Sequence, residues 1–250
     1  MSERTPVVFI RDLWLHASSW DRWVDLFTVH GYAPIAPGWP GDEPTAAGTR
    51  ERPGGLADQG LHDVMQHYAR IAHGLDGRPV LIGYGLGGLL ALELAGETHA
   101  AGAVAIEAVP VSARVAALPG AAGRRPVVLG REGFRVVFGG AVSREESDRL
   151  HDQWAIPAPP RVLREAAERA GLAPRPGGRG VNSVRAPVLL VTSGASRPRA
   201  AGEPASAGTH GAAAADDAVG FPDRGPSLVI DGGWRLVADS CLSWMDAHEL

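Results

Sequence analysis

Short apolar runs alternate along the chain with longer stretches in which apolar residues recur at helical spacing. Runs of three to seven apolar residues have the length of buried strands, whereas longer stretches with i, i+3, i+4 spacing predict amphipathic helices. The expected strands are 7–10, 32–36, 80–82, 103–106 and 186–192. The expected helices are a segment from Trp20 that stops at Gly31, then 58–74, 86–95, 143–154, 160–170 and a last helix from about 231.

This alternation of strands and helices predicts an α/β fold with a mostly parallel sheet flanked by helices on both faces. Ligands then belong at the C-terminal ends of the strands. Residues 111–180 carry few strand signals, and we interpret them as a helical cap inserted into a core made of 1–110 and 181–250. The Pro/Gly-rich segment 43–57 is expected to be a loop, and the low-complexity segment 194–220 is expected to be loose.

Composition narrows the function classes. The 250 residues carry a net charge of −4 without a basic face, which argues against a nucleic-acid partner. Since no apolar run reaches membrane-spanning length and the N-terminus leads directly into a strand, we expect neither a membrane partner nor a signal peptide. The single cysteine, Cys241, lies on the apolar stripe of the last helix and fits a reducing, cytoplasmic location. All 24 basic residues are Arg, which excludes lysine-based Schiff-base chemistry.

A glycine-rich turn connects the strand at 80–82 to the following helix, and it has three interpretations. Gly83, Gly85 and Gly88, with Glu107 downstream, fit a dinucleotide fingerprint. The frame Gly83-Tyr-Gly85-Leu-Gly87 also fits the G-x-S-x-G nucleophile elbow, with Gly85 at the serine position. The turn could equally be a tight connection without any ligand. The glycines alone do not choose among these.

Several segments in order resemble the α/β-hydrolase superfamily, in particular its small esterase- or lipase-like members. They are Val7–His16, Gly31–Gly41, the glycine turn, Ser143–Asp148 with Trp154–Pro159, and Arg224–Trp234. The resemblance runs from residue 7 to about 247 and is poor across 194–220. It implies the α/β-hydrolase fold, and it makes the nucleophile elbow the preferred interpretation of the turn.

The same resemblance indicates a degenerate catalytic triad. The nucleophile position holds Gly85, the acid position Ser196 and the histidine position Pro226. The His-Gly of the family's oxyanion loop is replaced by Arg11-Asp12. Because all three triad roles lack a suitable side chain, we expect no acyl-enzyme and no serine-hydrolase activity.

Other groups remain for non-hydrolytic chemistry. The backbone N–H groups of Leu13 and Leu86 stand at the family's oxyanion-hole positions and could polarise a carbonyl. The candidate catalytic side chains are Glu107 or Asp12 as the base, Tyr84 as a proton donor and Arg11 as an anion clamp. Each also has a structural interpretation: a solvated Arg11–Asp12 pair, a packing role for Tyr84 and a capping role for Glu107.

The expected ligand is a small apolar molecule. The residues expected to line its pocket are Trp14, His16, Trp39 and Trp154. The histidine spacing offers no metal site, and we expect no cofactor. The preferred function is a cofactor-free cyclisation or elimination on an apolar carbonyl compound in specialised biosynthesis. The alternatives are a non-catalytic ligand-binding pseudoenzyme and a dinucleotide-binding protein, and the oligomeric state stays open.

Overall fold

A six-stranded sheet forms the centre of the molecule. The computed structural model describes residues 4–108, 125–171, 186–194 and 217–250. The strand order is β2-β1-β3-β4-β5-β6, and all five pairings are parallel. The strands are β1 (Pro6–Ile10), β2 (Ala33–Ile35), β3 (Val80–Tyr84), β4 (Gly102–Ile106), β5 (Val188–Ser193) and β6 (Asp217–Phe221).

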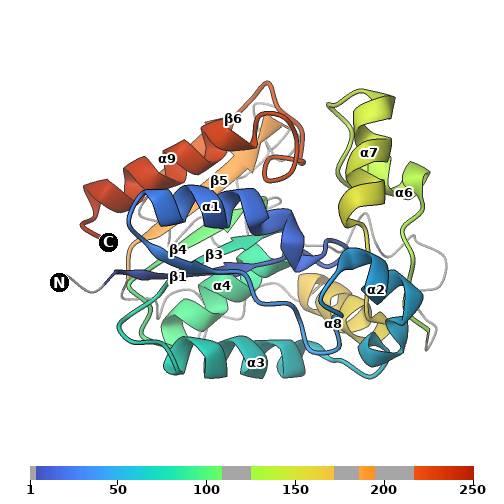
Figure 1. Ribbon diagram of the computed structural model, residues 1–250, viewed down its shortest axis with the longest axis horizontal. Coiled ribbons are helices and arrows are strands. Elements are labelled where there is room, and N and C mark those ends of the chain that lie inside the picture. Colours follow the sequence, from blue (N-terminus) through green and yellow to red (C-terminus); the bar gives the residue numbers. More distant parts are fainter. Residues whose placement is uncertain (1–3, 109–124, 172–185, 195–216) are drawn as a thin grey trace.

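Helices cover both faces of this sheet, as expected. Helices α1 (Asp21–Val29) and α9 (Trp234–Ala247) lie on one face, and α3 (Leu61–His73) and α4 (Leu86–Glu97) lie on the other (Figure 1). The rings of Trp23 and Trp234 meet 6.1 Å apart and join α1 to α9. Apolar side chains on both sides of the central strands therefore lose contact with water, which is the main source of stability in such a fold.

The first helical layer begins differently from the sequence expectation. The short 3-10 helix η1 (Ala17–Trp20) precedes α1, and the side chain of His16 caps it by accepting a hydrogen bond from Ser18 N. Trp20 stacks on Phe9 of β1 at 4.7 Å, which fixes the start of the helix against the sheet.

Segment 43–57 is not the continuous loop that its composition predicts. It contains α2 (Ala46–Glu51) and the 3-10 helix η2 (Pro53–Leu56). Thr45 caps α2, because its hydroxyl oxygen accepts a hydrogen bond from Gly48 N at 3.0 Å. This local cap outweighs the low helix propensity of the surrounding glycines and prolines.

The expectation of a loose segment at 194–220 is wrong at its C-terminal end. Residues 217–221 form strand β6, the edge of the sheet, in register with β5. The strand is largely exposed and lacks an apolar run, so its pairing with β5 supplies the order that its sequence does not signal. Residues 195–216 lie outside the described residues.

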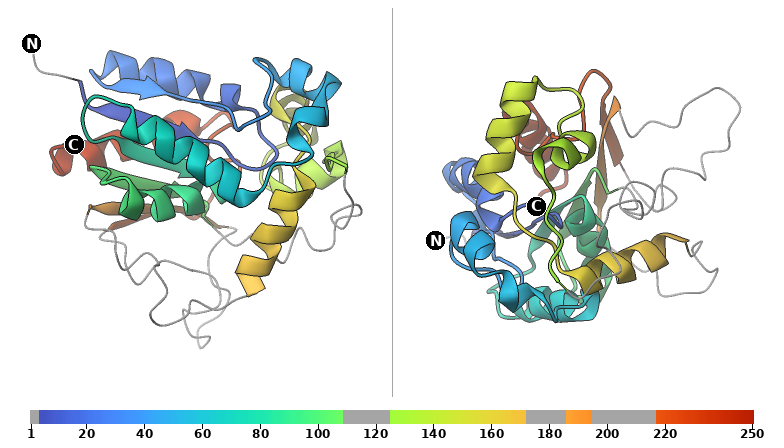
Figure 2. Two further views of the ribbon diagram at one scale, coloured as in Figure 1. Left: turned by 90° about the horizontal axis from the view of Figure 1, so that it is seen from below. Right: turned by 90° about the vertical axis from the view of Figure 1, so that its right-hand side faces the viewer.

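Three helices occupy residues 125–171, which we call the cap segment. They are α6 (Arg131–Val137), which the sequence did not predict, α7 (Arg144–Trp154) and α8 (Pro160–Gly171). The cap segment lies at the end of the sheet where the strands terminate, with α6 and α7 on one side and α8 on the other (Figure 2). Backbone hydrogen bonds from His16 N to Trp154 O and from Ile156 N to Trp14 O, both 2.9 Å, fasten it to the loop after β1. The predicted core–cap boundaries near 110 and 181 lie outside the described residues.

Candidate active site

The turn between β3 and α4 has a strained conformation that only glycine adopts readily. Gly85 has φ 57° and ψ −121°, and its N–H donates to Ile106 O at 2.9 Å. Gly83 and Gly87 serve close packing, since a Cβ on Gly83 would overlap the Gly87 carbonyl and one on Gly87 would overlap the Ile10 carbonyl. These close backbone contacts explain why the turn is rich in glycine, without the bound pyrophosphate that the dinucleotide interpretation requires.

The carboxylate of Asp12 fills the space beside this turn. Asp12 follows β1, and its Oδ1 accepts a hydrogen bond from Leu86 N at 2.8 Å. Burial raises the pKa of Asp12 to about 6, and the neighbouring Leu86 and Leu13 N–H groups and the Arg11 charge oppose this shift. Of the two backbone groups expected to form an oxyanion hole, Leu86 N–H is thus bonded to a side chain of the protein itself.

Asp12 and Gly85 are sterically matched. A Cβ built on Gly85 would overlap Asp12 Oδ1 and lie 2.5 Å from its Cγ. Any side chain at position 85, including a serine nucleophile, is incompatible with the present position of the Asp12 carboxylate.

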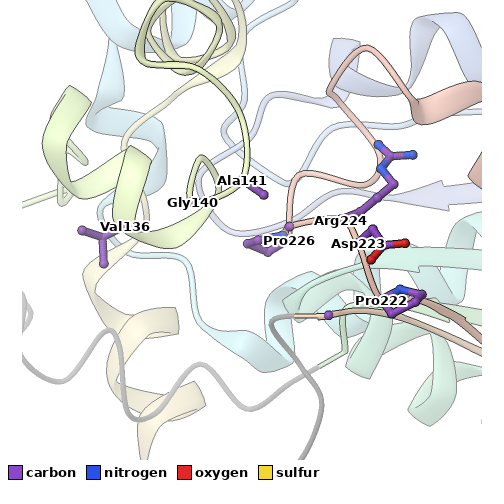
Figure 3. Close-up of a pocket in the computed structure, with 9 residues that line it drawn as sticks. Val136, Gly140, Ala141, Pro222, Asp223, Arg224 and Pro226 are labelled. Carbon is purple, nitrogen blue, oxygen red and sulfur yellow. The ribbon is translucent and has the colours of Figure 1, made fainter.

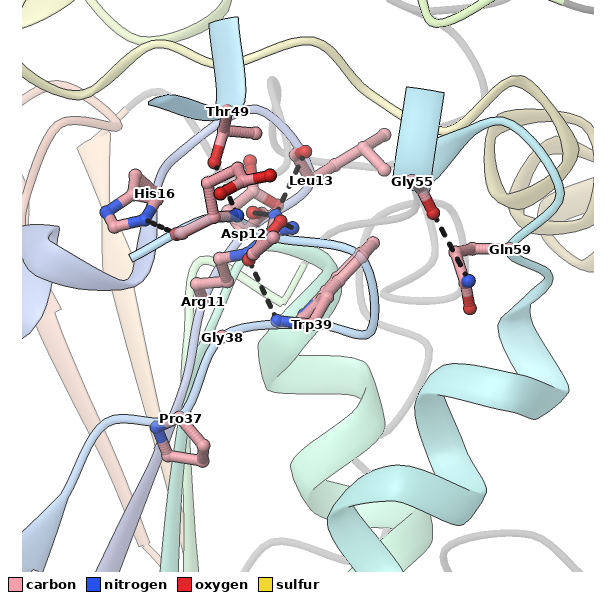
Figure 4. A network of polar contacts seen from close by, with 12 residues as sticks. Arg11, Asp12, Leu13, His16, Pro37, Gly38, Trp39, Thr49, Gly55 and Gln59 are labelled. Atoms are coloured by element: carbon pink, nitrogen blue, oxygen red, sulfur yellow. Dashed lines mark hydrogen bonds and ion pairs between the residues drawn. The ribbon is translucent and has the colours of Figure 1, made fainter. Parts of the chain in front are cut away.

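Arg11 is fully buried and forms an ion pair with Asp42 rather than with Asp12 (Figure 4). Its Nε and Nη2 each donate to the Asp42 carboxylate at 2.8 Å, and its Nη1 donates to the carbonyl oxygens of Asp12 and Leu13. The guanidinium also lies 4.1 Å from the centre of the Trp39 ring. Neither a solvated pair nor a guanidinium directed at a ligand describes this geometry.

Tyr84 and Glu107 both tie strand ends to neighbouring segments. The Tyr84 hydroxyl donates to the Pro226 carbonyl, and burial together with the nearby carboxylates of Asp12, Glu107 and Asp231 raises the pKa of Tyr84 well above its ordinary value. Glu107 has φ 50°, and its carboxylate accepts the Ser193 N–H. Tyr84 therefore keeps its proton, and the capping interpretation of Glu107 agrees with its contact.

The four expected pocket residues are buried among protein atoms. Trp14 donates from Nε1 to Val127 O at 3.2 Å, and Trp154 lies against Arg22 at 5.3 Å. His16 Nδ1 contacts Ser18 Oγ at 2.9 Å, and its Nε2 donates to Glu43 O at 3.0 Å. The contact between His16 and Ser18 belongs to the cap of η1, because the same Nδ1 accepts the Ser18 N–H.

A cavity of about 430 Å³ opens between the cap segment and the loop after β6 (Figure 3). Its walls combine small residues with the charged side chains of Asp223 and Arg224. They consist of Val136, Gly140, Ala141, Gly194 and Pro222–Pro226. None of the four expected pocket residues belongs to this wall. Pro226, the expected histidine position, forms part of it, whereas the expected acid position Ser196 lies outside the described residues.

Two carboxylates near the site escaped the sequence analysis. Asp42 holds Arg11, and Asp231 accepts hydrogen bonds from Ser227 Oγ at 2.7 Å and Gly233 N at 2.9 Å, besides pairing with Arg224. Asp42 follows a glycine and Asp231 precedes one, and an aspartate beside a glycine is common in turns. Their burial, which no local pattern signals, is what gives them a role.

In the part of the chain that the structure describes, no group of three His, Cys, Asp or Glu side chains could hold a metal ion. No described helix is long and apolar enough to cross a membrane. Cys241 is buried on α9, where burial raises the pKa of its thiol to about 12, in keeping with a core role.

Three solved structures with this architecture are distant from the chain in sequence. A metagenome-derived lipolytic enzyme is 16% identical with a TM-score of 0.64, and the match covers 98% of this chain and 95% of that one. Tomato methylketone synthase I in complex with 2-tridecanone is 11% identical with a TM-score of 0.66, covering 98% and 99%. A monoacylglycerol lipase from Paleococcus ferrophilus is 17% identical with a TM-score of 0.64, covering 97% and 94%. Such identities establish a shared fold only.

Sequence comparison gives the family. No curated protein matches the chain at a significant level. The model of the alpha/beta hydrolase family matches residues 7–239. This range includes the elbow turn, the described cap helices and all six strands, apart from the first residue of β1. The chain belongs to the alpha/beta hydrolase family.

Proposed function

We propose that this protein acts on a small apolar carbonyl compound without an acyl-enzyme, using Asp12 as a general base. The observation that carries the proposal is the buried Asp12 carboxylate, bonded to Leu86 N–H beside a glycine that offers no nucleophile. A buried carboxylate with a pKa near 6 is a much stronger base than an exposed aspartate and is still ionised at neutral pH.

The proposed step is proton abstraction next to a carbonyl group. Asp12 takes the proton from the substrate carbon, the C–H electron pair forms the enolate, and the negative charge moves to the carbonyl oxygen. Protonated Asp12 holds the Leu86 N–H less strongly, so this donor becomes available to the enolate oxygen. Elimination or cyclisation would follow from such an enolate. No cofactor is required for this step.

The remaining candidates receive supporting roles. Arg11 is already bonded to Asp42 and to two carbonyl groups, so we replace its expected role as an anion clamp by a role inside the loop. Tyr84 donates to Pro226, and Glu107 accepts from Ser193 N. These contacts favour positioning of the strand ends over direct proton transfer.

The cavity is the proposed place for the ligand. Its wall includes Pro226, whose carbonyl oxygen accepts the Tyr84 hydroxyl at the end of β3, and Arg224, which could pair with a polar end of the ligand. The fold accommodates a ketone in one distant relative, tomato methylketone synthase I with 2-tridecanone. A cytoplasmic location forms part of the proposal and draws on the single, buried cysteine.

A second candidate is a ligand-binding protein without catalysis. It is favoured by the internal hydrogen bonds of Leu86 N–H, Tyr84 OH and the Glu107 carboxylate, which leave these groups satisfied without a substrate. In that case the cavity would bind an apolar molecule and Asp12 would only stabilise the turn.

Deuterium exchange separates these candidates without knowledge of the natural substrate. Methyl ketones from 2-butanone to 2-tridecanone are incubated with the protein in D2O, and the loss of their α-hydrogen NMR signals is followed. We expect the protein to accelerate exchange for at least one ketone, with a rate that rises with pH and levels off above about 6, as Asp12 ionises. Asp12→Asn, which is nearly isosteric, should reduce the rate by a factor of about 100 or more.

Matched controls define the outcomes. Ser18→Ala should leave exchange unchanged, and a fluorophosphonate serine-hydrolase probe should not label the protein. If the protein binds ketones without accelerating exchange, the second candidate, a ligand-binding protein without catalysis, would replace the proposed enzyme. Covalent labelling of a serine would reinstate acyl transfer and contradict the proposal.

A further inference from the structure

We propose that Arg11 is a positioning residue for Asp12 and that a buried series of contacts from helix α3 through loop 37–42 holds it in place. The inference deepens the proposed function, on which its catalytic meaning rests. Its structural content concerns a set of side chains that the expected mechanism did not include, namely Asp42, Trp39 and Tyr68.

The first step connects Arg11 to the peptide that carries the proposed base. Arg11 Nη1 donates to Asp12 O at 2.9 Å and to Leu13 O at 3.2 Å. These two carbonyl oxygens turn toward the guanidinium, whereas the Asp12 carboxylate and the Leu13 N–H meet at the elbow turn. Arg11 therefore fixes the orientation of the loop on the side opposite its functional groups.

The second step fixes Arg11 itself. The Asp42 carboxylate binds its Nε and Nη2 in a two-point contact, which restricts rotation of the guanidinium far more than a single contact does. Asp42 Oδ2 also accepts the Trp39 N–H at 2.8 Å, and the Trp39 ring covers the guanidinium. With Arg11 fully buried, none of these contacts competes with water.

The third step attaches loop 37–42 to helix α3. Tyr68 OH donates to Pro37 O at 2.8 Å, and His67 Nε2 contacts Gly38 O at 3.0 Å. Figure 4 shows Pro37, Gly38 and Trp39 running past the Arg11 side chain toward Asp12. A helix on the face of the sheet thus contributes to the orientation of the proposed base, in addition to the contacts of the cap segment with the same loop.

The charge of Arg11 affects the pKa of Asp12, which a residue that only packed against the loop would leave unchanged. Arg11 favours the ionised form of Asp12, while the neighbouring Tyr84 is neutral and faces the further carboxylates Glu107 and Asp231. Loss of the guanidinium should raise the pKa of Asp12, and loss of its geometry should weaken the bond from Leu86 N–H.

The experiment titrates the Asp12 carboxyl carbon by NMR in protein labelled with 13C-aspartate, assigned with Asp12→Asn. Arg11→Gln alone leaves Asp42 buried and unpaired, so the informative variant is the neutral pair Arg11→Gln with Asp42→Asn. We expect its Asp12 pKa to rise by about half a unit or more, and its Leu86 amide proton to move upfield. Arg11→Lys, which keeps the charge without the two-point contact, should show the amide change with a smaller pKa change.

Arg52→Gln is the matched control, because Arg52 forms an exposed ion pair with Glu43 and should leave the Asp12 titration unchanged. A folded neutral pair with an unaltered Asp12 titration and an unaltered Leu86 amide would overturn the inference. Since this readout needs no substrate, altered titration without ketone exchange in the unmodified protein would reject the proposed function and leave the positioning role intact.

Discussion

Gly85→Ser is expected to destabilise the protein by roughly 2–6 kcal/mol in urea denaturation. Backbone strain at φ 57° contributes about 1–3 kcal/mol for a residue with a side chain. The new Cβ also displaces the Asp12 carboxylate, which leaves the buried Leu86 N–H without its acceptor at a further cost of about 1–3 kcal/mol.

A double-mutant cycle assigns that loss to Asp12. Asp12→Gly removes the overlapping carboxylate, so Gly85→Ser should cost less in that background by about 1–3 kcal/mol. Gly31→Ser is the matched control, since Gly31 has φ 91° with open space around it and should show backbone strain alone. Additive effects of Asp12→Gly and Gly85→Ser would show that the two positions are not coupled.

The relieved double variant should still not hydrolyse esters. Pro226 occupies the position expected for the histidine, and its side chain cannot accept a proton from the new serine, while its carbonyl oxygen already accepts the Tyr84 hydroxyl. Turnover of p-nitrophenyl esters by this variant would mean that another base lies within reach of position 85.

Asp42→Ala is expected to destabilise the protein by about 3–5 kcal/mol, because it leaves the fully buried Arg11 guanidinium without its counter-charge. Urea denaturation at neutral pH measures the loss. Asp42→Asn should cost less, since an amide oxygen can still accept one of the two hydrogen bonds.

The surface pair Arg52–Glu43 provides the comparison. Arg52 is 67% exposed, and Glu43→Ala should leave stability nearly unchanged, because water screens this pair. A cost for Asp42→Ala as small as this would show that water or another group reaches Arg11, and it would remove the basis for a rigid loop after β1.

Much of the fold follows from local sequence patterns. Strands such as β3 and β4 are short apolar runs that are buried on both faces, so their sequence directly reflects their environment. Strand β6 could not be found this way, because an exposed edge strand that contains Gly220 is ordered by its partner β5. Helix α2 was missed because one capping residue, Thr45, determines its start.

The sequence predicted where the candidate catalytic side chains lie better than it predicted which groups they contact. Arg11, Asp12, Tyr84 and Glu107 do lie at strand ends, where the alternation of strands and helices places them. Their partners could not be derived, because Asp42 lies 31 residues from Arg11 and the Pro226 carbonyl lies 142 residues from Tyr84. Sequence spacing does not report which of several nearby groups accepts a hydrogen bond.

The occupation of the oxyanion-hole donors by Asp12 can be measured directly by NMR. In the unmodified protein, the Asp12 carboxyl carbon should titrate near pH 6, and the Leu86 amide proton, hydrogen-bonded to that carboxylate, should shift upfield with the same midpoint as the pH falls. An Asp12 that titrates near 4, with a Leu86 amide that does not respond, would place the carboxylate in water and contradict the account.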